Sequence, residues 1–450
     1  MDGFTLSLVG FGLMLLLIFL RMPIGVALFL TGFFGVWIVT GRPNMVMAQM
    51  KSLTYETFSS YSLSVVPLFL LMGQFATRSG MSKGLFRAAA DWLGHYRGGM
   101  AMASVGACAG FGAVCGSSLA TASTMGQVAL PEMRRYGYSG RLSTGVLAAG
   151  GTLGILIPPS VILVIYAILT EQNIAKMFVA ALVPGLLAAL GYILVVAIYV
   201  RIWPDEATSL PRKSYGERLR ALAGVWPVVV IFGLVMWGIA GDSNWAQAGQ
   251  QALFTPTEGA AVGAVLTGLY GALNGGLTLR TFFDCVMETA VTTAMIFMIV
   301  FGAQVFNTFL ALTQTPQGLA DWVTAQGFAP MTVLLMMLAL YLVFGCVMDS
   351  LSMILLTIPI FFPIIQGLDF GLTPEETAIW FGILALIVVE VGLITPPVGM
   401  NLFIISSMAR GVPMMETYRG VLPFVLSDMV RVAILVAAPS ISLFLVRAVS

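Results

Sequence analysis

The stretch GILIPPS, residues 154–160, decides the fold of this chain, and it recurs as GLITPPV at residues 392–398. Both copies interrupt long apolar segments. A double proline removes two backbone N–H donors and disfavours the helical conformation in the residue before it, so each segment is expected to unwind there. Unwound backbone inside a bilayer is tolerated only where it is buried in protein or lines a cavity. Two such interruptions in matching positions of two halves therefore indicate the binding site of a transporter.

The composition is that of a polytopic membrane protein in a lipid bilayer. Of the 450 residues, 59% are hydrophobic and only 9% are charged, and the mean hydropathy is +0.97. In a typical soluble domain, roughly a quarter of the residues are charged. The net charge of +1, without a basic face or tail, argues against a nucleic-acid partner. The N-terminal apolar run lacks a positively charged leader, so it is expected to be a retained first helix.

Ten apolar windows are long enough to cross about 30 Å of hydrocarbon. They lie near 4–20, 23–40, 60–77, 142–170, 177–200, 224–241, 257–275, 289–310, 377–408 and 420–447. Two further apolar stretches, 100–131 and 330–364, contain polar or Gly-rich centres that divide each into arms of about 15 residues, shorter than the roughly 20 that a crossing helix needs. The sequence therefore predicts two re-entrant hairpins whose tips meet within the membrane.

The distribution of cationic residues supports this topology. With the N-terminus outside and both hairpins re-entrant, sixteen of the 21 Lys and Arg residues fall on the inner side and four on the outer side, and Arg431 lies inside or near the last helix. Lys and Arg near helix ends mark the cytoplasmic face. If residues 330–364 crossed the membrane fully, the later loops would move to the opposite face and the excess of Lys and Arg on the inner side would be lost. We therefore expect both termini on the non-cytoplasmic side.

The two halves of the chain are expected to form an inverted-topology repeat. Asp91-Trp92 matches Asp321-Trp322 at an offset of 230, and Ser118 matches Ser350 at 232. Five predicted crossings separate the two units, and an odd number turns the second one upside down. The predicted domains are N-terminal scaffold helices (1–58), the first repeat (59–200), a cytoplasmic loop with further scaffold helices (201–288) and the second repeat (289–450).

Several motifs together resemble one known family. They are GSSLAT (116–121), LPEM (130–133), the first double-proline stretch, and EVGLITPPVGMN (390–401), and they resemble the large membrane subunit of TRAP (tripartite ATP-independent periplasmic) transporters. The likeness covers nearly the whole chain. It implies the ion-transporter superfamily, an elevator mechanism, and sodium-coupled import of a small organic acid such as sialic acid or a C4-dicarboxylate. The implied partners are a small four-helix membrane subunit, which is not fused here, and a periplasmic substrate-binding protein. The implied location is the bacterial inner membrane, with both termini periplasmic.

The polar tips and broken helices suit sodium chemistry, because this hard cation prefers oxygen ligands and unwound backbone supplies carbonyl groups. At least two ions are expected. The first predicted site contains Ser117, Ser118, Thr121, Gly151, Thr152, Gly154 and Pro158. The second predicted site contains Ser350, Ser352, Gly392, Thr395, Pro396 and Asn401.

The half-helices that begin after each break direct free N–H groups and positive dipole ends toward a substrate carboxylate. Ionisable residues at membrane depth suggest an ion or substrate pathway, although Asp349 and Glu390 could instead be structural partners of a nearby hydroxyl or amide. The predicted substrate-binding residues are Pro159, Ser160, Asp349, Glu390, Pro397, Val398 and Gly399.

Other functions fit the sequence less well. An enzyme needs a nucleophile with its base or a metal-ligand set, and the one histidine, His95, lies in an amphipathic segment (80–97) that is expected at the membrane interface. The four cysteines are expected to be packing residues. Asp428 and Arg431 are expected to pair or to lie at a helix end. Polar tips that enter from both faces of the membrane fit alternating access better than they fit an open channel. A single-component sodium-coupled carrier or antiporter of the same superfamily remains the alternative.

Overall fold

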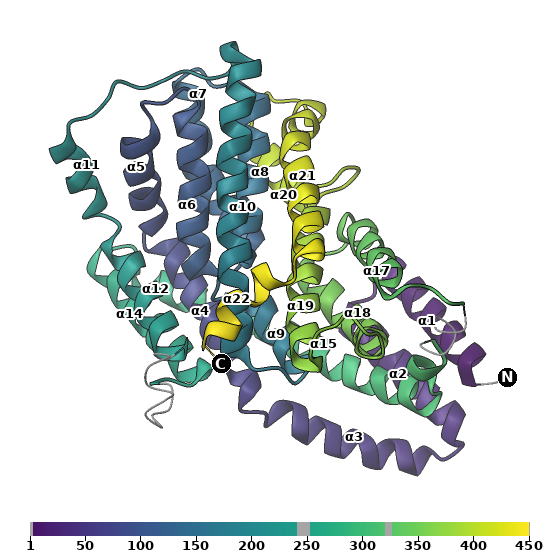
Figure 1. Ribbon diagram of the computed structural model, residues 1–450. Coiled ribbons are helices and arrows are strands. Elements are labelled where there is room, and N and C mark those ends of the chain that lie inside the picture. Colours follow the sequence, from purple (N-terminus) through teal and green to yellow (C-terminus); the bar gives the residue numbers. More distant parts are fainter. Residues whose placement is uncertain (1–2, 241–252, 320–325, 450) are drawn as a thin grey trace.

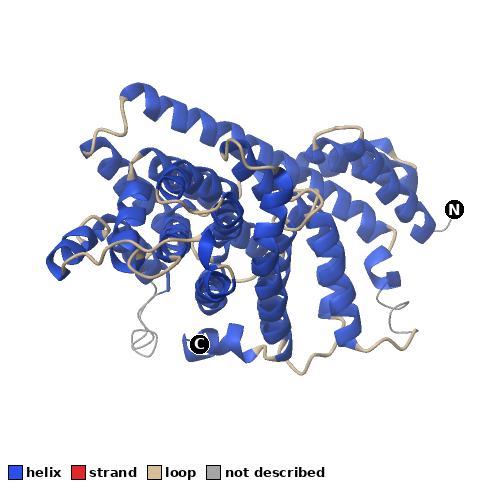
Figure 2. Cartoon of the chain, turned by 90° about the horizontal axis from the view of Figure 1, so that it is seen from above, coloured by secondary structure: helices blue, strands red, loops and turns tan. Residues whose placement is uncertain are grey.

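The computed structural model describes residues 3–240, 253–319 and 326–449, and the regular elements in these ranges are helices. Figure 2 shows them joined by short loops. The predicted match of Asp91-Trp92 to Asp321-Trp322, and part of the predicted domain 201–288, lie outside the described residues. With the labels of Figure 1, the helices are α1 (Gly3–Phe19), α2 (Ile24–Thr40), α3 (Pro43–Phe58), η1 (Ser62–Ser64), α4 (Val65–Arg78), α5 (Met81–Leu93), α6 (Gly99–Cys115), α7 (Ser118–Arg135), α8 (Gly140–Leu156), α9 (Val161–Leu169), α10 (Ile174–Ile202), η2 (Pro204–Glu206), α11 (Tyr215–Leu222), α12 (Trp226–Ala240), α14 (Pro256–Leu273), α15 (Leu279–Leu312), α17 (Pro330–Gly345), α18 (Ser350–Gln366), α19 (Pro374–Gly392), α20 (Met400–Met408), α21 (Met414–Ala437) and α22 (Ser440–Val449).

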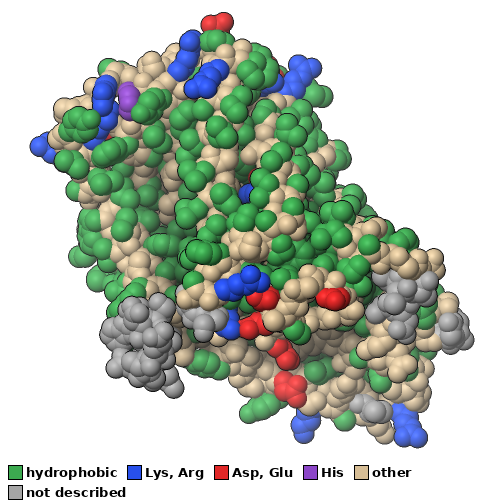
Figure 3. All heavy atoms as spheres, viewed as in Figure 1, with side chains coloured by type: hydrophobic (Ala, Val, Ile, Leu, Met, Phe, Trp, Pro, Cys, Tyr) green, Lys and Arg blue, Asp and Glu red, His purple; other side chains and the backbone are tan. Residues whose placement is uncertain are grey.

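The chain is an all-helical multi-pass membrane protein. Within the described residues, α10, α15 and α21 are each long and apolar enough to cross a membrane, and the bent pairs α3–α4, α8–α9 and α11–α12 meet the same criterion together. Helix α10 exposes Leu186, Leu190, Leu194 and Ile198, one side chain per turn, as expected for a lipid-facing stripe. Figure 3 shows apolar side chains over the middle of the molecule, cationic ones at its upper end, and cationic and acidic ones together over its lower part. The number of crossings and their orientation stay predictions.

Two details of the predicted spans are wrong. The window 420–447 is two helices, because α21 ends at Ala437 and α22 begins at Ser440. Pro439 lacks an N–H, and it disfavours the helical conformation in Ala438, whose φ of −131° lies outside the helical range. The helix α3 was not predicted, and it joins α4 at a bend of 51° as one candidate span.

Both predicted hairpins are present. Helix α6 ends at Cys115, and α7 begins shortly beyond it, after a turn in which Gly116 has a φ of +65°. Helix α17 ends at Gly345, and α18 begins at Ser350. The polar centres that divided the two apolar stretches are thus the hairpin tips.

Both predicted helix breaks are present as well. Helix α8 ends at Leu156 and α9 begins at Val161, with a bend of 45° between them. Helix α19 ends at Gly392 and α20 begins at Met400. The Pro158–Pro159 and Pro396–Pro397 peptide bonds are both cis.

The packing of these elements follows the inverted repeat. Helix α7 packs on α8 and α18 on α19, and the units also cross over, because α9 packs on α18 and α20 packs on α7 and α8. Helices α10 and α21, which follow the two broken helices, run in opposite directions: in Figure 1, α10 ends near the top, whereas α21 ends near the bottom beside α22. Each first hairpin arm meets the end of its broken helix through glycines, because a Cβ on Gly112 would lie 2.5 Å from Gly154 Cα and a Cβ on Gly392 would lie 2.6 Å from Gly345 Cα.

Candidate functional site

The two hairpin tips meet at one cavity of about 180 Å³, here called the central cavity. The first tip contributes residues 116–119 and the second contributes residues 349–351. Residues beside the two breaks and on α4 and α15 complete the wall. They are Leu70, Ile155, Val161, Ile162, Thr292, Ile296 and Leu393.

Three helices begin at the central cavity, and each is capped by a polar side chain. Ser117 accepts from Ala120 N at 3.4 Å at the start of α7, and Ser160 accepts from Leu163 N at 3.5 Å at the start of α9. Asp349 accepts from Ser352 N at 3.0 Å at the start of α18. A helix N-terminus carries partial positive charge, and the neutral serine caps of α7 and α9 leave that charge in place, which favours an anionic ligand such as a carboxylate. At α18 the Asp349 carboxylate offsets it.

The first tip lies directly against the end of α8. A Cβ on Gly154 would lie 2.3 Å from Thr121 Oγ1 and 2.6 Å from the Ser117 carbonyl oxygen, so only glycine permits this approach. Thr121 Oγ1 is buried and has no hydrogen-bond partner among the described residues. Buried polar atoms are nearly always paired, so an unpaired oxygen beside a carbonyl suits a bound cation. Ser117, Thr121 and Gly154 thus meet as predicted.

Asn401 lies with the first tip, whereas the sequence had placed it in the second ion site. Its Nδ2 donates to Ala148 O on α8 at 3.4 Å, and a Cβ on Gly151 would lie 3.2 Å from the same nitrogen. Its Oδ1 is buried without a hydrogen-bond partner in the described chain. The cause is the crossing of α20 onto α7 and α8, which the sequence did not reveal.

Glu390 lies between the two tips and outside the lining of the central cavity. The Ser350 hydroxyl donates to Glu390 Oε1 at 2.5 Å, and Ser118 of the first tip is close enough to interact with the same carboxyl group. The Glu390 side chain is fully buried, and its Oε2 has no hydrogen-bond partner in the described chain. Glu390 is thus a partner of a hydroxyl, as one of the two alternatives from the sequence expected, and its role in an ion or substrate pathway stays a prediction.

The second break is held against the end of α17. Gly399 N donates to Cys346 O at 3.2 Å, beside the close approach of Gly392 to Gly345. The Ser352 hydroxyl donates to Asp349, and the Thr395 hydroxyl donates to Val391 O at 2.6 Å. Each hydroxyl oxygen keeps a lone pair that can bind a cation.

The remaining predicted residues divide into those beside the first tip and those at the second break that do not line the central cavity. A Cβ on Gly116 would lie 2.9 Å from Pro159 O, which brings Pro158, Pro159 and Ser160 beside the first tip. Near the second break, Pro397 O accepts from the Tyr418 hydroxyl at 2.5 Å, and Pro397, Val398 and Gly399 do not line the central cavity.

Thr152 faces away from the tips, contrary to its predicted place in the first ion site. Its hydroxyl donates to Ala149 O at 2.7 Å and lies 3.1 Å from Tyr192 Oη. The Tyr192 hydroxyl donates to Asp428 at 2.7 Å, and Asp428 pairs with Arg431 at 2.8 Å, which confirms the predicted pair. Thr152 therefore joins a buried polar network that links α8, α10 and α21.

Sequence reasoning missed the far wall of the central cavity. Leu70 lies on α4, and Thr292 and Ile296 lie on α15. These residues stand in apolar helices without a motif, so no signal in the sequence separates them from ordinary packing residues. The described residues contain no cluster of three His, Cys, Asp or Glu side chains that could hold a metal ion.

Comparisons with known proteins agree with this geometry. The family model of the tripartite ATP-independent periplasmic transporter, DctM component, matches residues 11–441. The chain is 38% identical over 396 residues, 87% of each chain, to the C4-dicarboxylate TRAP transporter large permease protein DctM of Pseudomonas aeruginosa. It is 30% identical over 435 residues to the sialic acid TRAP transporter large permease protein SiaM of Vibrio cholerae, which covers 95% of this chain and 96% of the relative.

A solved structure shares the fold. The YdaH transporter of Alcanivorax borkumensis, described as having an unusual topology, matches 88% of this chain and 88% of its own with a TM-score of 0.65. Its sequence is 15% identical, so this likeness concerns the fold alone. Together with the family match over residues 11–441, the paired hairpins and broken helices place this chain in the DctM family, the large membrane subunits of TRAP transporters.

Proposed function

We propose that this chain carries a small organic acid across the bacterial inner membrane, driven by co-transported sodium, after a periplasmic binding protein has delivered the acid. The observation that carries the proposal is the central cavity, where both hairpin tips and the N-termini of α7, α9 and α18 converge. The positive ends of α7 and α9, which neutral serines cap, can hold a carboxylate without a buried arginine in contact with it.

Sodium coupling is supported by the oxygen atoms behind the cavity. Thr121 Oγ1 and Asn401 Oδ1 are buried oxygen atoms without hydrogen-bond partners in the described chain. Thr121 and Asn401 contact neighbouring turns of α8, and the Ser117 carbonyl lies beside Gly154. Buried acceptors without donors are costly unless a cation satisfies them. Sodium is a co-transported substrate in this proposal, and two or more ions fit the two tips.

Among organic acids, a C4-dicarboxylate is the first candidate and sialic acid the second. The central cavity, at about 180 Å³, is smaller than the roughly 300–1,000 Å³ of pockets that hold drug-sized ligands. The relative from Pseudomonas aeruginosa, named for C4-dicarboxylates, has higher identity than the one named for sialic acid. Both considerations favour the more compact acid.

The arrangement of the cavity wall supports transport by an elevator step. The tips and breaks form one packed unit, while Leu70 and Thr292 close the cavity from α4 and α15. If this unit slides past α4 and α15 as a rigid body, the cavity becomes accessible from the other face of the membrane while the tips and breaks keep their contacts. A small membrane subunit would hold the fixed part in place, and the binding protein would favour opening through its different affinity for the two states.

The test is reconstitution of three mixtures into proteoliposomes under an inward sodium gradient: this subunit alone, with its small membrane subunit, and with both partners. The proposal predicts concentrative uptake of a C4-dicarboxylate by the complete mixture only. Robust uptake by the subunit alone would favour the single-component carrier or antiporter. Uptake of sialic acid in preference to a C4-dicarboxylate would reverse the order of the two substrate candidates.

A further inference from the structure

A second cavity, of about 810 Å³, lies between α5, α7 and the segment that leads to α11, at the end of the molecule that the charge distribution predicts to be cytoplasmic. We call it the basic cavity. Four of its lining residues are Lys or Arg, and His95 lies among them. The charged lining residues are Lys83, Arg87, Asp91, Glu132, Arg135 and Lys213.

Two of these cations are not neutralised by a carboxylate. Lys213 pairs with Asp91 at 2.5 Å, and Arg135 lies 4.0 Å from Glu132. Lys83 and Arg87, one turn apart on α5, are both exposed and pair with no carboxylate among the described residues. The basic cavity therefore offers two free positive charges to an anion.

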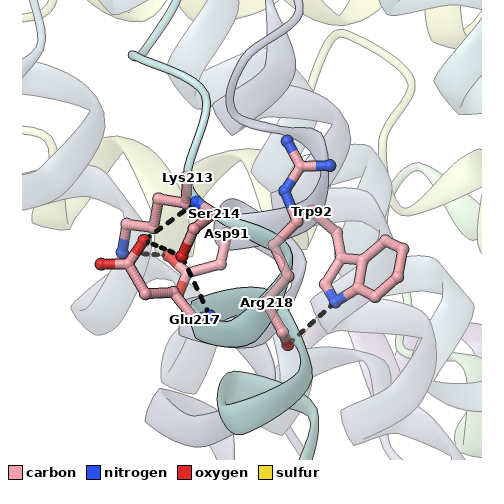
Figure 4. A network of polar contacts seen from close by, with 6 residues as sticks. All are labelled: Asp91, Trp92, Lys213, Ser214, Glu217 and Arg218. Carbon is pink, nitrogen blue, oxygen red and sulfur yellow. Dashed lines mark hydrogen bonds and ion pairs between the residues drawn. The ribbon is translucent and has the colours of Figure 1, made fainter.

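The wall that faces α5 is fixed in place. Trp92 Nε1 donates to Arg218 O at 3.2 Å, and the Arg218 side chain is buried against Trp92 and Tyr215. Figure 4 shows Trp92 and Arg218 together with Lys213 and the capping box in which Ser214 and Glu217 begin α11. The segment that carries Lys213 is thus anchored to α5.

One face of α7 connects the basic cavity to the central cavity. Leu119 lines the central cavity, and Gln127 and Pro131 line the basic cavity. Between them, Ala120 and Ser123 are half-buried, and Gln127 and Pro131 are exposed. Residues three to four apart lie on the same face of a helix. An accessible stripe with small side chains near the tip therefore runs along α7 from one cavity to the other.

We propose that the basic cavity is a second anion site, at which Lys83 and Arg87 bind a carboxylate group of the transported acid as it passes along α7 to the cytoplasm. The proposal rests on the proposed function, because it takes the same substrate. Anionic lipid headgroups share the relevant chemistry, since their phosphate would also bind two cations at this depth. The stripe on α7 favours the transported acid.

The test uses the complete reconstituted transporter with a C4-dicarboxylate as the probe. The double variant Lys83→Gln/Arg87→Gln is expected to raise, by about fivefold, the substrate concentration for half-maximal transport from the cytoplasmic face, as for the loss of two exposed charge pairs. The same constant measured from the periplasmic face should stay unchanged. High salt should abolish the difference, because it screens exposed charges.

The matched control is Arg97→Gln. Arg97 is also an exposed cation and lies shortly after α5 in the chain, but it does not line the basic cavity. An equal change in Arg97→Gln, or no change in the double variant while the wild type transports, would overturn the second site and leave the proposed function standing. An effect of the double variant only in vesicles that contain anionic lipid would assign the site to lipid phosphate and overturn the transit role. No carboxylate transport by the wild type would overturn both proposals.

Discussion

Replacing Gly154 by alanine probes the contact between the first hairpin tip and the broken helix α8. The added Cβ would lie 2.3 Å from Thr121 Oγ1 and 2.6 Å from the Ser117 carbonyl oxygen, whereas ordinary Cβ contacts begin at 3.4 Å. The hydroxyl can rotate, but the carbonyl belongs to the backbone, so the tip must move away from α8. Helix propensity by itself would favour alanine by about 0.5–1 kcal/mol, so a loss cannot come from a weaker helix.

The size of the effect follows from the overlap. Overpacking of a close-packed site costs about 1–3 kcal/mol. If the sodium-bound state requires the tip in contact and the sodium-free state tolerates its displacement, this cost appears as lost sodium affinity. A difference of about 1–3 kcal/mol corresponds to about 5- to 150-fold. We therefore expect Gly154→Ala to raise the sodium concentration for half-maximal uptake by at least about fivefold.

The assay is uptake by the complete transporter in proteoliposomes as a function of external sodium, with thermal unfolding measured in parallel. Gly106→Ala is the matched control, because Gly106 lies on the same hairpin and an added Cβ there meets no atom within 4 Å. The control should behave as the wild type does. Equal sodium dependence of Gly154→Ala and Gly106→Ala, with both variants folded, would refute the placement of a sodium site between the first tip and α8.

Three further predictions concern other parts of the site. Ser118→Ala or Ser350→Ala should raise the sodium concentration for half-maximal uptake, and unchanged sodium titrations for both would remove these residues from the ion sites. Tyr192→Phe should lower the free energy of unfolding by about 1–3 kcal/mol, because it removes a donor from a buried carboxylate, while leaving sodium dependence near that of the wild type; a large shift in sodium dependence with unchanged stability would contradict a purely structural network. In a background without native cysteines, Arg134→Cys and Asp369→Cys, both exposed, should react with a membrane-impermeant reagent from opposite faces; labelling from the same face would contradict the predicted topology.

The architecture could be predicted from the sequence because it depends on strong local signals. Double prolines must interrupt a helix, and a Gly-Ser tip divides an apolar stretch into arms too short to cross a membrane. Both signals occur twice, and the odd number of predicted crossings between the two units indicates that the second unit is inverted. The break at Pro439 carried the same kind of signal, and it was missed because hydropathy continues across it.

The composition of the two ion sites could not be predicted to the same extent. Asn401 follows the second break in sequence, yet α20 crosses to the first unit and places this side chain on α8. Thr152 is adjacent to Gly151, but neighbouring residues of a helix face different directions. The Thr152 hydroxyl therefore lies beside the Tyr192 hydroxyl and not at the first tip. These assignments depend on packing between segments far apart in the chain, which local pattern does not encode.

The proposal that the paired tips form sodium sites is tested most directly by exchanging the driving ion. Uptake of a C4-dicarboxylate by the complete transporter is measured with an inward sodium gradient and with an equal inward potassium gradient, both without a proton gradient or membrane potential. The account predicts concentrative uptake with sodium, with a steeper than linear dependence on sodium concentration, and none with potassium. Equal uptake with potassium would contradict it.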